Sequence, residues 1–135
     1  MFPASTKGGG QTFAFPDTCK TPSPGGPIPI PYPNIGMVNQ VTKESTKVKI
    51  AGAGAVTKKT EMTRSQGDEA GTAGGGVVSN MNMNKVTYKM GSMKVKVEGQ
   101  EVQHLIATTG HNGMNANMPS GMQVAPSQVK VLVAN

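Results

Sequence analysis

The sequence predicts a mainly β protein with little or no helix, and three observations support this. Gly and Pro are abundant, at 18 and 10 of 135 residues, and both suit turns and extended backbone but oppose helix interiors. Alternating Lys/Val segments recur along the chain, as expected for half-buried strands. No segment combines ten residues of helical periodicity with capping residues. The length predicts a single domain covering residues 1–135.

The N-terminal part contains two unusual segments. Residues 1–11 are rich in Gly, Ser and Thr, and we expect them to be flexible. Residues 16–34 carry Pro at nearly every second or third position, which excludes a helix or a central strand because Pro lacks an amide donor. Ile28, Ile30 and Tyr32 alternate with these prolines. This pattern predicts a stiff, extended strap across the body of the protein.

Alternation of Lys or Thr with Val, Ile or Met marks the strands. The predicted strands are residues 46–50, 85–90, 93–97, 102–106 and 128–133. Gly- and Asn-rich segments, residues 66–76 and 110–121, are predicted to connect them as loops. Trp is absent, and only three Phe and two Tyr are present. The core should therefore be thin, so that a partner or a metal would add to its stability.

An internal repeat accompanies the strands. Lys47–Gly52 recurs 47 residues later as Lys94–Gly99, and Gln128–Val131 is a weaker third copy. Chance recurrence of a common strand pattern is the alternative. The matching Gly at the end of the first two copies favours a true repeat.

Charge and targeting signals limit the function classes. The net charge is +6, but charged residues are only 15% of the chain and are dispersed. Lysines without an aromatic platform favour a solvated strand face over nucleic-acid contact. One Cys excludes an internal disulfide, the N-terminus lacks the apolar region of a signal peptide, and no apolar run approaches a membrane span. We expect synthesis in the cytoplasm and export only by a dedicated machine.

Catalytic patterns are missing from the sequence. There is no G-x-S-x-G motif and no Walker A motif, and His104 and His111 are the only histidines. The seven acidic residues include Asp68 and Glu69 in a Gly-flanked turn, where Asp suits the backbone. From the sequence alone we therefore expect that the protein is not an enzyme.

Zinc is the metal that the side chains favour most. Cys19, His104 and His111 are suitable ligands, and a fourth would have to be an acid such as Asp17 or a water molecule. No C-x-x-C or H-x-x-x-H spacing accompanies them. The alternative interpretation is that Cys19 is a small buried apolar residue, that His104 lies on a strand face and that His111 forms hydrogen bonds in a loop. The ten Met residues could bind Cu(I), but filling of an aromatic-poor core explains them better.

Two separated motifs resemble the PAAR-like "PIPY" family. The first comprises Phe15–Pro22 and Pro27–Ile35, and the second is Ser65–Val77. Met93–Gly99 and His111–Asn112 agree as well, so the similarity covers nearly the whole chain. The family-motif residues are Pro16, Asp17, Cys19, Pro29, Pro31, Tyr32, Pro33, Asn34, Gly67, Asp68, Ala70 and Gly71.

The resemblance implies a small conical tip with long Gly/Pro-rich loops that caps the trimeric VgrG spike of a bacterial type VI secretion system. One tip per trimer would sharpen the spike for transient membrane puncture, carry effector proteins and be injected with the spike, without contacting nucleic acid. The three Lys/Val strands fit this role, because each could extend one strand column of the spike as part of a pseudo-threefold base. The docking residues are expected to be Lys47, Val48, Lys49, Ile50, Lys94, Val95, Lys96, Val97, Val129, Lys130 and Val131.

The chain departs from the classical PAAR tip, which holds zinc with three His and one Cys. It has two His and no Pro-Ala-Ala-Arg sequence, so the proline strap and tight Gly loops are expected to replace metal cross-links. The sequence ends at Asn135 directly after the last predicted strand, and we expect no fused toxin domain. Two alternatives to the spike-tip function are a small basic nucleic-acid-binding β protein and, with weaker support from the sequence, a copper-handling module.

Overall fold

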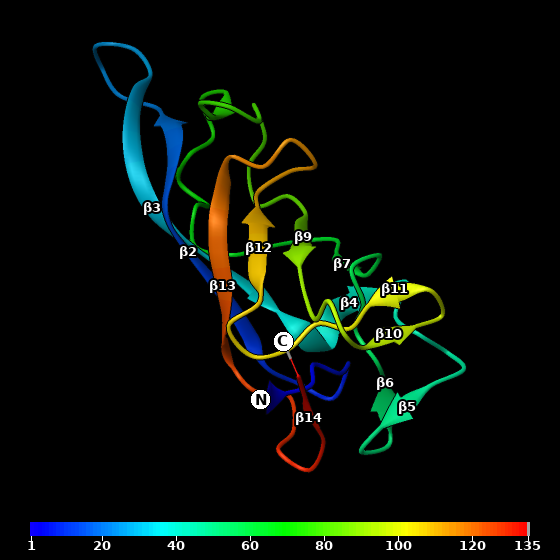
Figure 1. The fold of residues 1–135 in the computed structure, drawn as a ribbon. Coiled ribbons are helices and arrows are strands. Elements are labelled where there is room, and N and C mark those ends of the chain that lie inside the picture. The colour runs from blue at the N-terminus through cyan, green and yellow to red at the C-terminus, as the bar shows by residue number, and fades with distance from the viewer. Residues whose placement is uncertain (135) are drawn as a thin grey trace.

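The largest element of the computed structural model, which describes residues 1–134, is an eight-stranded antiparallel sheet (Figure 1). Its strand order is β3-β2-β13-β12-β9-β7-β4, and β8 also pairs with β2. The strands are β2 (Gln11–Thr21), β3 (Ile28–Met37), β4 (Val41–Thr42), β7 (Glu61–Met62), β8 (Gly75–Gly76), β9 (Val86–Met90), β12 (Thr108–His111) and β13 (Met118–Ala125). In the described part of the chain, the one helical element is the short 3₁₀ turn η1 (Val38–Gln40), which confirms the mainly β prediction.

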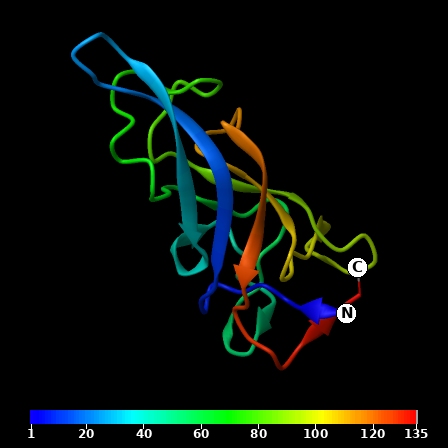
Figure 2. The same cartoon turned by 90° about the vertical axis from the view of Figure 1, so that its left-hand side faces the viewer.

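Three short antiparallel strand pairs lie at one end of this sheet. They join β1 (Phe2–Pro3) with β14 (Leu132–Val133), β5 (Lys49–Ile50) with β6 (Ala53–Gly54), and β10 (Lys96–Val97) with β11 (Gln100–Glu101). We call them the three hairpins, although one of them, β1 with β14, joins the two ends of the chain. The turn between β2 and β3 lies at the opposite end (Figures 1 and 2). The molecule therefore tapers from three hairpins toward a single one. Within residues 1–134, no helix has the length and apolar character needed to span a bilayer.

The proline-rich segment differs from its prediction, because residues 16–34 form most of a β-hairpin rather than a separate strap. Pro16 lies in β2, an internal strand. It is accommodated by a bulge: Ala14 faces Asn34 and Asp17 faces Tyr32, so that two residues of β2 oppose one of β3. Pro16 thus lies where the register between β2 and β3 is already shifted, so it has no residue of β3 directly opposite that needs its amide.

Strand β3 is the edge of the sheet, as Pro requires. Pro29, Pro31, Pro33 and Ile35 lie at every second position of the strand, so their backbone nitrogens face the same side. The amide of Ile35 points away from β2 and donates to Gln66 O at 2.7 Å. The missing amides of the prolines therefore face outward, where the β2–β3 ladder does not need them.

Three predicted segments have other structures than expected. Residues 1–11 include β1, and Ala4, Ser5 and Thr6 are buried, so part of this segment is packed into the fold. Residues 102–106 form isolated bridges instead of a strand, and residues 110–121 contribute to β12 and β13 instead of forming one loop. In each case tertiary pairing decided a segment whose composition is ambiguous.

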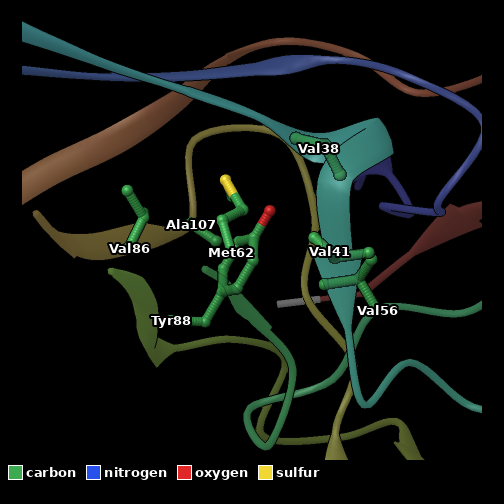
Figure 3. Packing of buried hydrophobic residues seen from close by; sticks show 7 residues of the cluster. All are labelled: Val38, Val41, Val56, Met62, Val86, Tyr88 and Ala107. Carbon is green, nitrogen blue, oxygen red and sulfur yellow. The ribbon is translucent and has the colours of Figure 1, made fainter. Parts of the chain in front are cut away.

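The core is thin, as the composition indicated. Its main cluster lies between the large sheet and the hairpin end and contains Val38, Val41, Val56, Met62, Val86, Tyr88 and Ala107 (Figure 3). A second cluster lies within the hairpin end, where Ala4, Val102 and Val133 pack with Ile50, Val95 and Val97. This second cluster takes one or two residues from each of the three hairpins.

Candidate functional site

A closed ring of backbone joins the three hairpins and gives this end of the molecule an approximate threefold arrangement. The ring consists of residues 4–6, 55–57 and 102–104, and each segment forms an antiparallel bridge with the other two. One amide of each segment donates to the next segment, from Ser5 to Gln103, from Gln103 to Val56 and from Val56 to Ser5, at 2.9, 2.9 and 3.0 Å. The ring is thus a cyclic set of equivalent hydrogen bonds. We call the ring and its three hairpins the base.

Each ring segment is reached from a turn of the same construction. The turn opens with a polar side chain that accepts backbone amides two or three positions later, and these side chains are Ser45, Ser92 and Gln128. The fourth residue of the turn then accepts the amide of the first ring residue at 3.0–3.1 Å. These pairs are Val48 with Ala55, Val95 with Val102, and Val131 with Ala4. The internal repeat predicted from the sequence is therefore a structural repeat.

The third copy of the repeat is assembled from both ends of the chain. Strands β14 and β1 occupy the place that a continuous hairpin occupies in the other two copies. The contacts align Val131 with Val48, whereas the sequence pattern aligned Val129 with it. Alternating patterns repeat every two residues, so the sequence could not distinguish these two registers.

The residues predicted to dock on a partner form the outer strand of each hairpin and the turn before it. Strands β5, β10 and β14 each pair on one side only within residues 1–134. Because Val48, Val95 and Val131 bond inward and an antiparallel ladder alternates, the next residue of each strand turns its amide and carbonyl outward. These residues are Lys49, Lys96 and Leu132, and all three are exposed. The base therefore offers three unpaired strand edges in equivalent positions.

The family motifs meet in a second place, a buried polar centre between β2, β3, β12 and the loops near the β2–β3 end. Asp17 is its middle residue and is fully buried. Its carboxylate accepts hydrogen bonds from the side-chain amides of Asn34 at 3.1 Å, Asn112 at 3.2 Å and Asn117. Three neutral donors thus replace the water shell of a buried carboxylate, without a cationic partner.

Cys19 and Asp68 lie beside Asp17 and are also fully buried. The Cys19 thiol lies 3.6 Å from a carboxylate oxygen of each Asp. Burial and the two neighbouring carboxylates raise the pKa of Cys19, so it remains a thiol. Burial and the interaction with Asp17 raise the pKa of Asp68 to about 7, although the Met83 amide at 3.1 Å opposes this shift.

Tight backbone contacts hold the motif loops against the two strands. A Cβ atom at Gly67 would lie 2.2 Å from Pro33 O, and one at Gly71 would lie 2.3 Å from the Cβ of Cys19. Tyr32 is bonded to Thr21 through their hydroxyl groups at 2.6 Å, whereas Ala70 is exposed at the outside of its loop. The glycines of the second motif are therefore required for close approach to the first.

The zinc ligands expected from the sequence do not converge. His111 is buried, but its Nδ1 lies 2.7 Å from Asn34 Oδ1 and its Nε2 lies 2.9 Å from Thr109 Oγ1. His104 belongs to the ring of the base, stacked on Phe2, and is not part of the polar centre. In the described residues, one set of three donors lies together, namely Asp17, Cys19 and Asp68. Neither His104 nor His111 belongs to this set, so the Cys/His zinc site expected from the sequence does not fit this structure.

Two groups of the polar centre predict opposite pH dependences. The pKa of Asp68 is raised from 3.8 to about 7, so its contribution to stability falls as the pH rises between these values. Burial lowers the pKa of His111 from 6.5 to about 4, so its contribution rises with pH in that range. The two slopes nearly cancel from roughly pH 5 to 6.5.

Asp68→Asn removes the titrating carboxyl and leaves His111 as the main source of pH dependence. We therefore expect the thermal unfolding midpoint of this variant to rise with pH over this window. The wild type should change little, and the double variant D68N/H111Q should be flat again. Thermal unfolding followed by circular dichroism at several pH values measures this. A flat profile for D68N would contradict the assignment.

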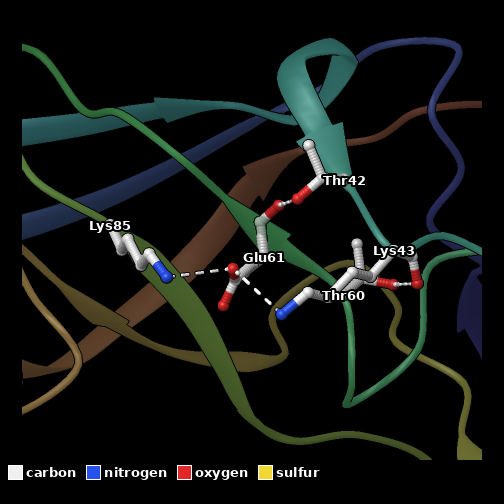
Figure 4. A network of polar contacts seen from close by, with 5 residues as sticks. All are labelled: Thr42, Lys43, Thr60, Glu61 and Lys85. Carbon is white, nitrogen blue, oxygen red and sulfur yellow. Dashed lines mark hydrogen bonds and ion pairs between the residues drawn. The ribbon is translucent and has the colours of Figure 1, made fainter.

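A basic cleft of about 500 Å³ lies on the flank between the base and the large sheet. Its lining includes Lys43, Lys58, Lys59 and Lys89, and its floor includes Glu61. Glu61 is largely buried and lies 3.4 Å from Lys43 and 3.2 Å from Lys85 (Figure 4). Although burial opposes it, these two ammonium groups lower the pKa of Glu61, which stays ionised. The remaining lysines leave the cleft with a net positive charge.

Sequence reasoning missed Asn112 and Asn117 as members of the polar centre and missed the cleft altogether. Both asparagines lie in a segment that the sequence predicts to be a Gly/Asn-rich loop, where Asn is common for backbone reasons. The pairing of His111 with Asn112 in the family pattern was the one available signal. The lysines of the cleft, Lys43, Lys58, Lys59 and Lys89, come from three separate segments and share no spacing that marks them in the sequence.

Comparison with known proteins identifies relatives of this chain. The model of the family described as "Toxin PAAR-like domain" matches residues 10–119. The DNase toxin Tse7 of Pseudomonas aeruginosa is 36% identical over 124 residues, which is 87% of this chain and 32% of that protein. No solved structure matches the chain significantly.

This relative contradicts the expectation that the protein is not an enzyme, since that expectation rested on missing sequence motifs whereas the relative is a DNase toxin. The present chain spans about a third of the length of that toxin. Both findings support the resemblance to PAAR-like proteins that the motifs implied. By a family match over most of its length and by its identity to a relative, the chain belongs to the Toxin PAAR-like domain family.

Proposed function

We propose that this domain caps a trimeric VgrG spike of a type VI secretion system, with one domain per trimer. The observation that carries the proposal is the base, in which three equivalent hairpins surround a closed hydrogen-bonded ring. A single chain that binds a threefold partner must present three similar surfaces. Strands β5, β10 and β14 each have one unpaired edge, so each could accept one strand of the trimer by β-augmentation.

In this arrangement the β2–β3 hairpin points away from the spike and forms the narrow end of the assembly (Figure 2). The buried polar centre stiffens that end, because strand β3 and the loop between β12 and β13 donate hydrogen bonds to Asp17 of β2. We infer that the domain is made in the cytoplasm and leaves the cell when the spike is fired. Toxic cargo would travel with it, as the DNase toxin relative suggests.

The test replaces the three residues whose amides face outward from the base. We expect K49P/K96P/L132P to weaken binding to purified VgrG trimer at least about 100-fold, because each Pro removes a donor that the partner strand needs. The matched variant K49A/K96A/L132A keeps the amides and should bind within a few-fold of the wild type. Binding is measured by biolayer interferometry, and circular dichroism checks folding. Equal binding by the folded Pro variant would refute strand addition.

Contact with nucleic acid is a second candidate function, favoured by the basic cleft and by the DNase toxin relative. Lysines around a cleft could neutralise backbone phosphates, which makes binding steeply dependent on salt. We expect the wild type to bind duplex DNA with an affinity that falls as NaCl rises from 50 to 200 mM, with K58Q/K59Q/K89Q losing most of this dependence. Fluorescence anisotropy measures binding, and a plasmid-nicking assay with Mg²⁺ measures cleavage. Absent binding at 50 mM NaCl would exclude this function.

A further inference from the structure

The three turns of the base repeat more than their backbone requires. Aligned by their hydrogen bonds, they read Ser45–Val48, Ser92–Val95 and Gln128–Val131. The first position varies between Ser and Gln but always supplies the acceptor for the turn amides. The last position is Val in all three and supplies the carbonyl that bonds the ring. The structure of the base therefore explains both of these positions.

The two remaining positions of each turn behave differently from one another. The second is occupied by Thr46, Met93 and Val129, which share no chemistry, although all three are exposed. The third is Lys in every copy, namely Lys47, Lys94 and Lys130. Only the structural register reveals the third lysine, because the sequence pattern placed Val129 and Lys130 opposite Val48 and Lys49.

No contact within the domain accounts for these lysines. All three are exposed, and none forms an ion pair with an acidic residue in the part of the chain that the structure describes. By contrast, Lys7, Lys43 and Lys85 elsewhere on the surface are each paired with a Glu. The position after the Val does not carry a charge in every copy, since it is Lys49 and Lys96 in two copies but Leu132 in the third. Three unpaired ammonium groups thus lie at equivalent positions around the base.

We propose that Lys47, Lys94 and Lys130 form a ring of charges that recognises one carboxylate from each chain of a trimeric, acidic-tipped spike. The inference rests on the proposed docking function and adds the chemistry by which the partner is selected. Strand addition is insensitive to side-chain identity, so it cannot by itself tell one β-rich trimer from another. Charges at the rim of an interface supply this discrimination, mainly through the association rate and its dependence on salt. A threefold set of charges also allows three equivalent docking orientations, as a symmetric partner demands.

The experiment measures binding of the folded domain to purified VgrG trimer by stopped-flow fluorescence at 50 to 500 mM NaCl. We expect K47E/K94E/K130E to reduce affinity about 10- to 100-fold, mostly through slower association, and K47Q/K94Q/K130Q to lose most of the salt dependence. The control K58E/K59E/K89E makes the same change in net charge on the flank and should bind like the wild type. Unfolding midpoints establish that all variants are folded.

The outcomes separate this inference from the docking function. Wild-type binding that the Pro variant loses but K47E/K94E/K130E retains would overturn the lysine ring and leave docking intact. Equal weakening by the ring and flank variants would also overturn it, since net charge alone would then explain the effect. Failure of the wild type to bind any VgrG trimer would overturn both.

Discussion

Asp17→Ala is expected to lower the free energy of unfolding by about 4 kcal/mol or more, among the largest effects available in this chain. The substitution leaves the buried amides of Asn34, Asn112 and Asn117 without their shared acceptor. Each unsatisfied buried donor costs about 1–3 kcal/mol, and small domains have only about 5–15 kcal/mol in total. Asp17→Asn should be nearly as harmful, because its amide nitrogen would face other amide donors.

Urea unfolding measures the loss in the free energy of unfolding. Because the chain has no Trp, unfolding is followed by far-UV circular dichroism. Glu44→Ala is the matched control, because it removes a carboxylate whose ion-pair partner, Lys7, lies at the surface. It should change stability by less than about 1 kcal/mol. A similar small effect for Asp17→Ala would show that the polar centre does not hold the loops together.

Gly67→Ala is expected to cost more than about 3 kcal/mol. Gly67 has φ +117°, a conformation that strains residues with a side chain, and its added Cβ would lie 2.2 Å from Pro33 O. The clash falls between the two family motifs, so relief would require β3 and the Gly-rich loop to separate. The effect thus combines backbone strain with loss of packing around the polar centre.

Two other glycines separate these contributions. Gly52 has φ +82° with open space around its Cβ position, so Gly52→Ala should show the cost of strain alone, about 1 kcal/mol. Gly25 has neither a positive φ nor a close neighbour, and Gly25→Ala should be neutral. Thermal unfolding of the three variants gives the comparison. If Gly67→Ala resembled Gly52→Ala, the close contact between the motifs would be wrong.

Much of the base could be predicted from the sequence because it depends on local patterns. The Lys/Val alternation and the Gly after it located the first two hairpins, since these features report turn and strand geometry directly. The third copy was found but placed two residues out of register. Its true alignment depends on the bond from Ala4 to Val131, which joins opposite ends of the chain.

The polar centre was harder to predict, because its members come from segments far apart in the sequence. Asp17, Asn34 and Asp68 were marked as family-motif residues, but nothing local showed that one carboxylate would gather three amides. The same limit produced the zinc hypothesis, which counted donor types without their positions. His104 and His111 are seven residues apart in sequence and lie in different parts of the fold.

The proline segment was misjudged for a related reason. The rule that Pro avoids central strands holds for β3, which is an edge strand, and it fails at Pro16 only because a bulge absorbs that residue. Bulges are set by the register between two strands, and the register depends on both strands together. A single sequence segment does not contain that information.

The mass of the complex formed with VgrG tests the central claim most directly. Native mass spectrometry of the co-purified proteins should show one copy of this 13.9 kDa chain bound to three copies of VgrG, and no species with two or three copies. That result requires one chain to present three equivalent surfaces. Three copies per trimer, or no complex with a folded trimer, would mean that the base is not a threefold docking surface.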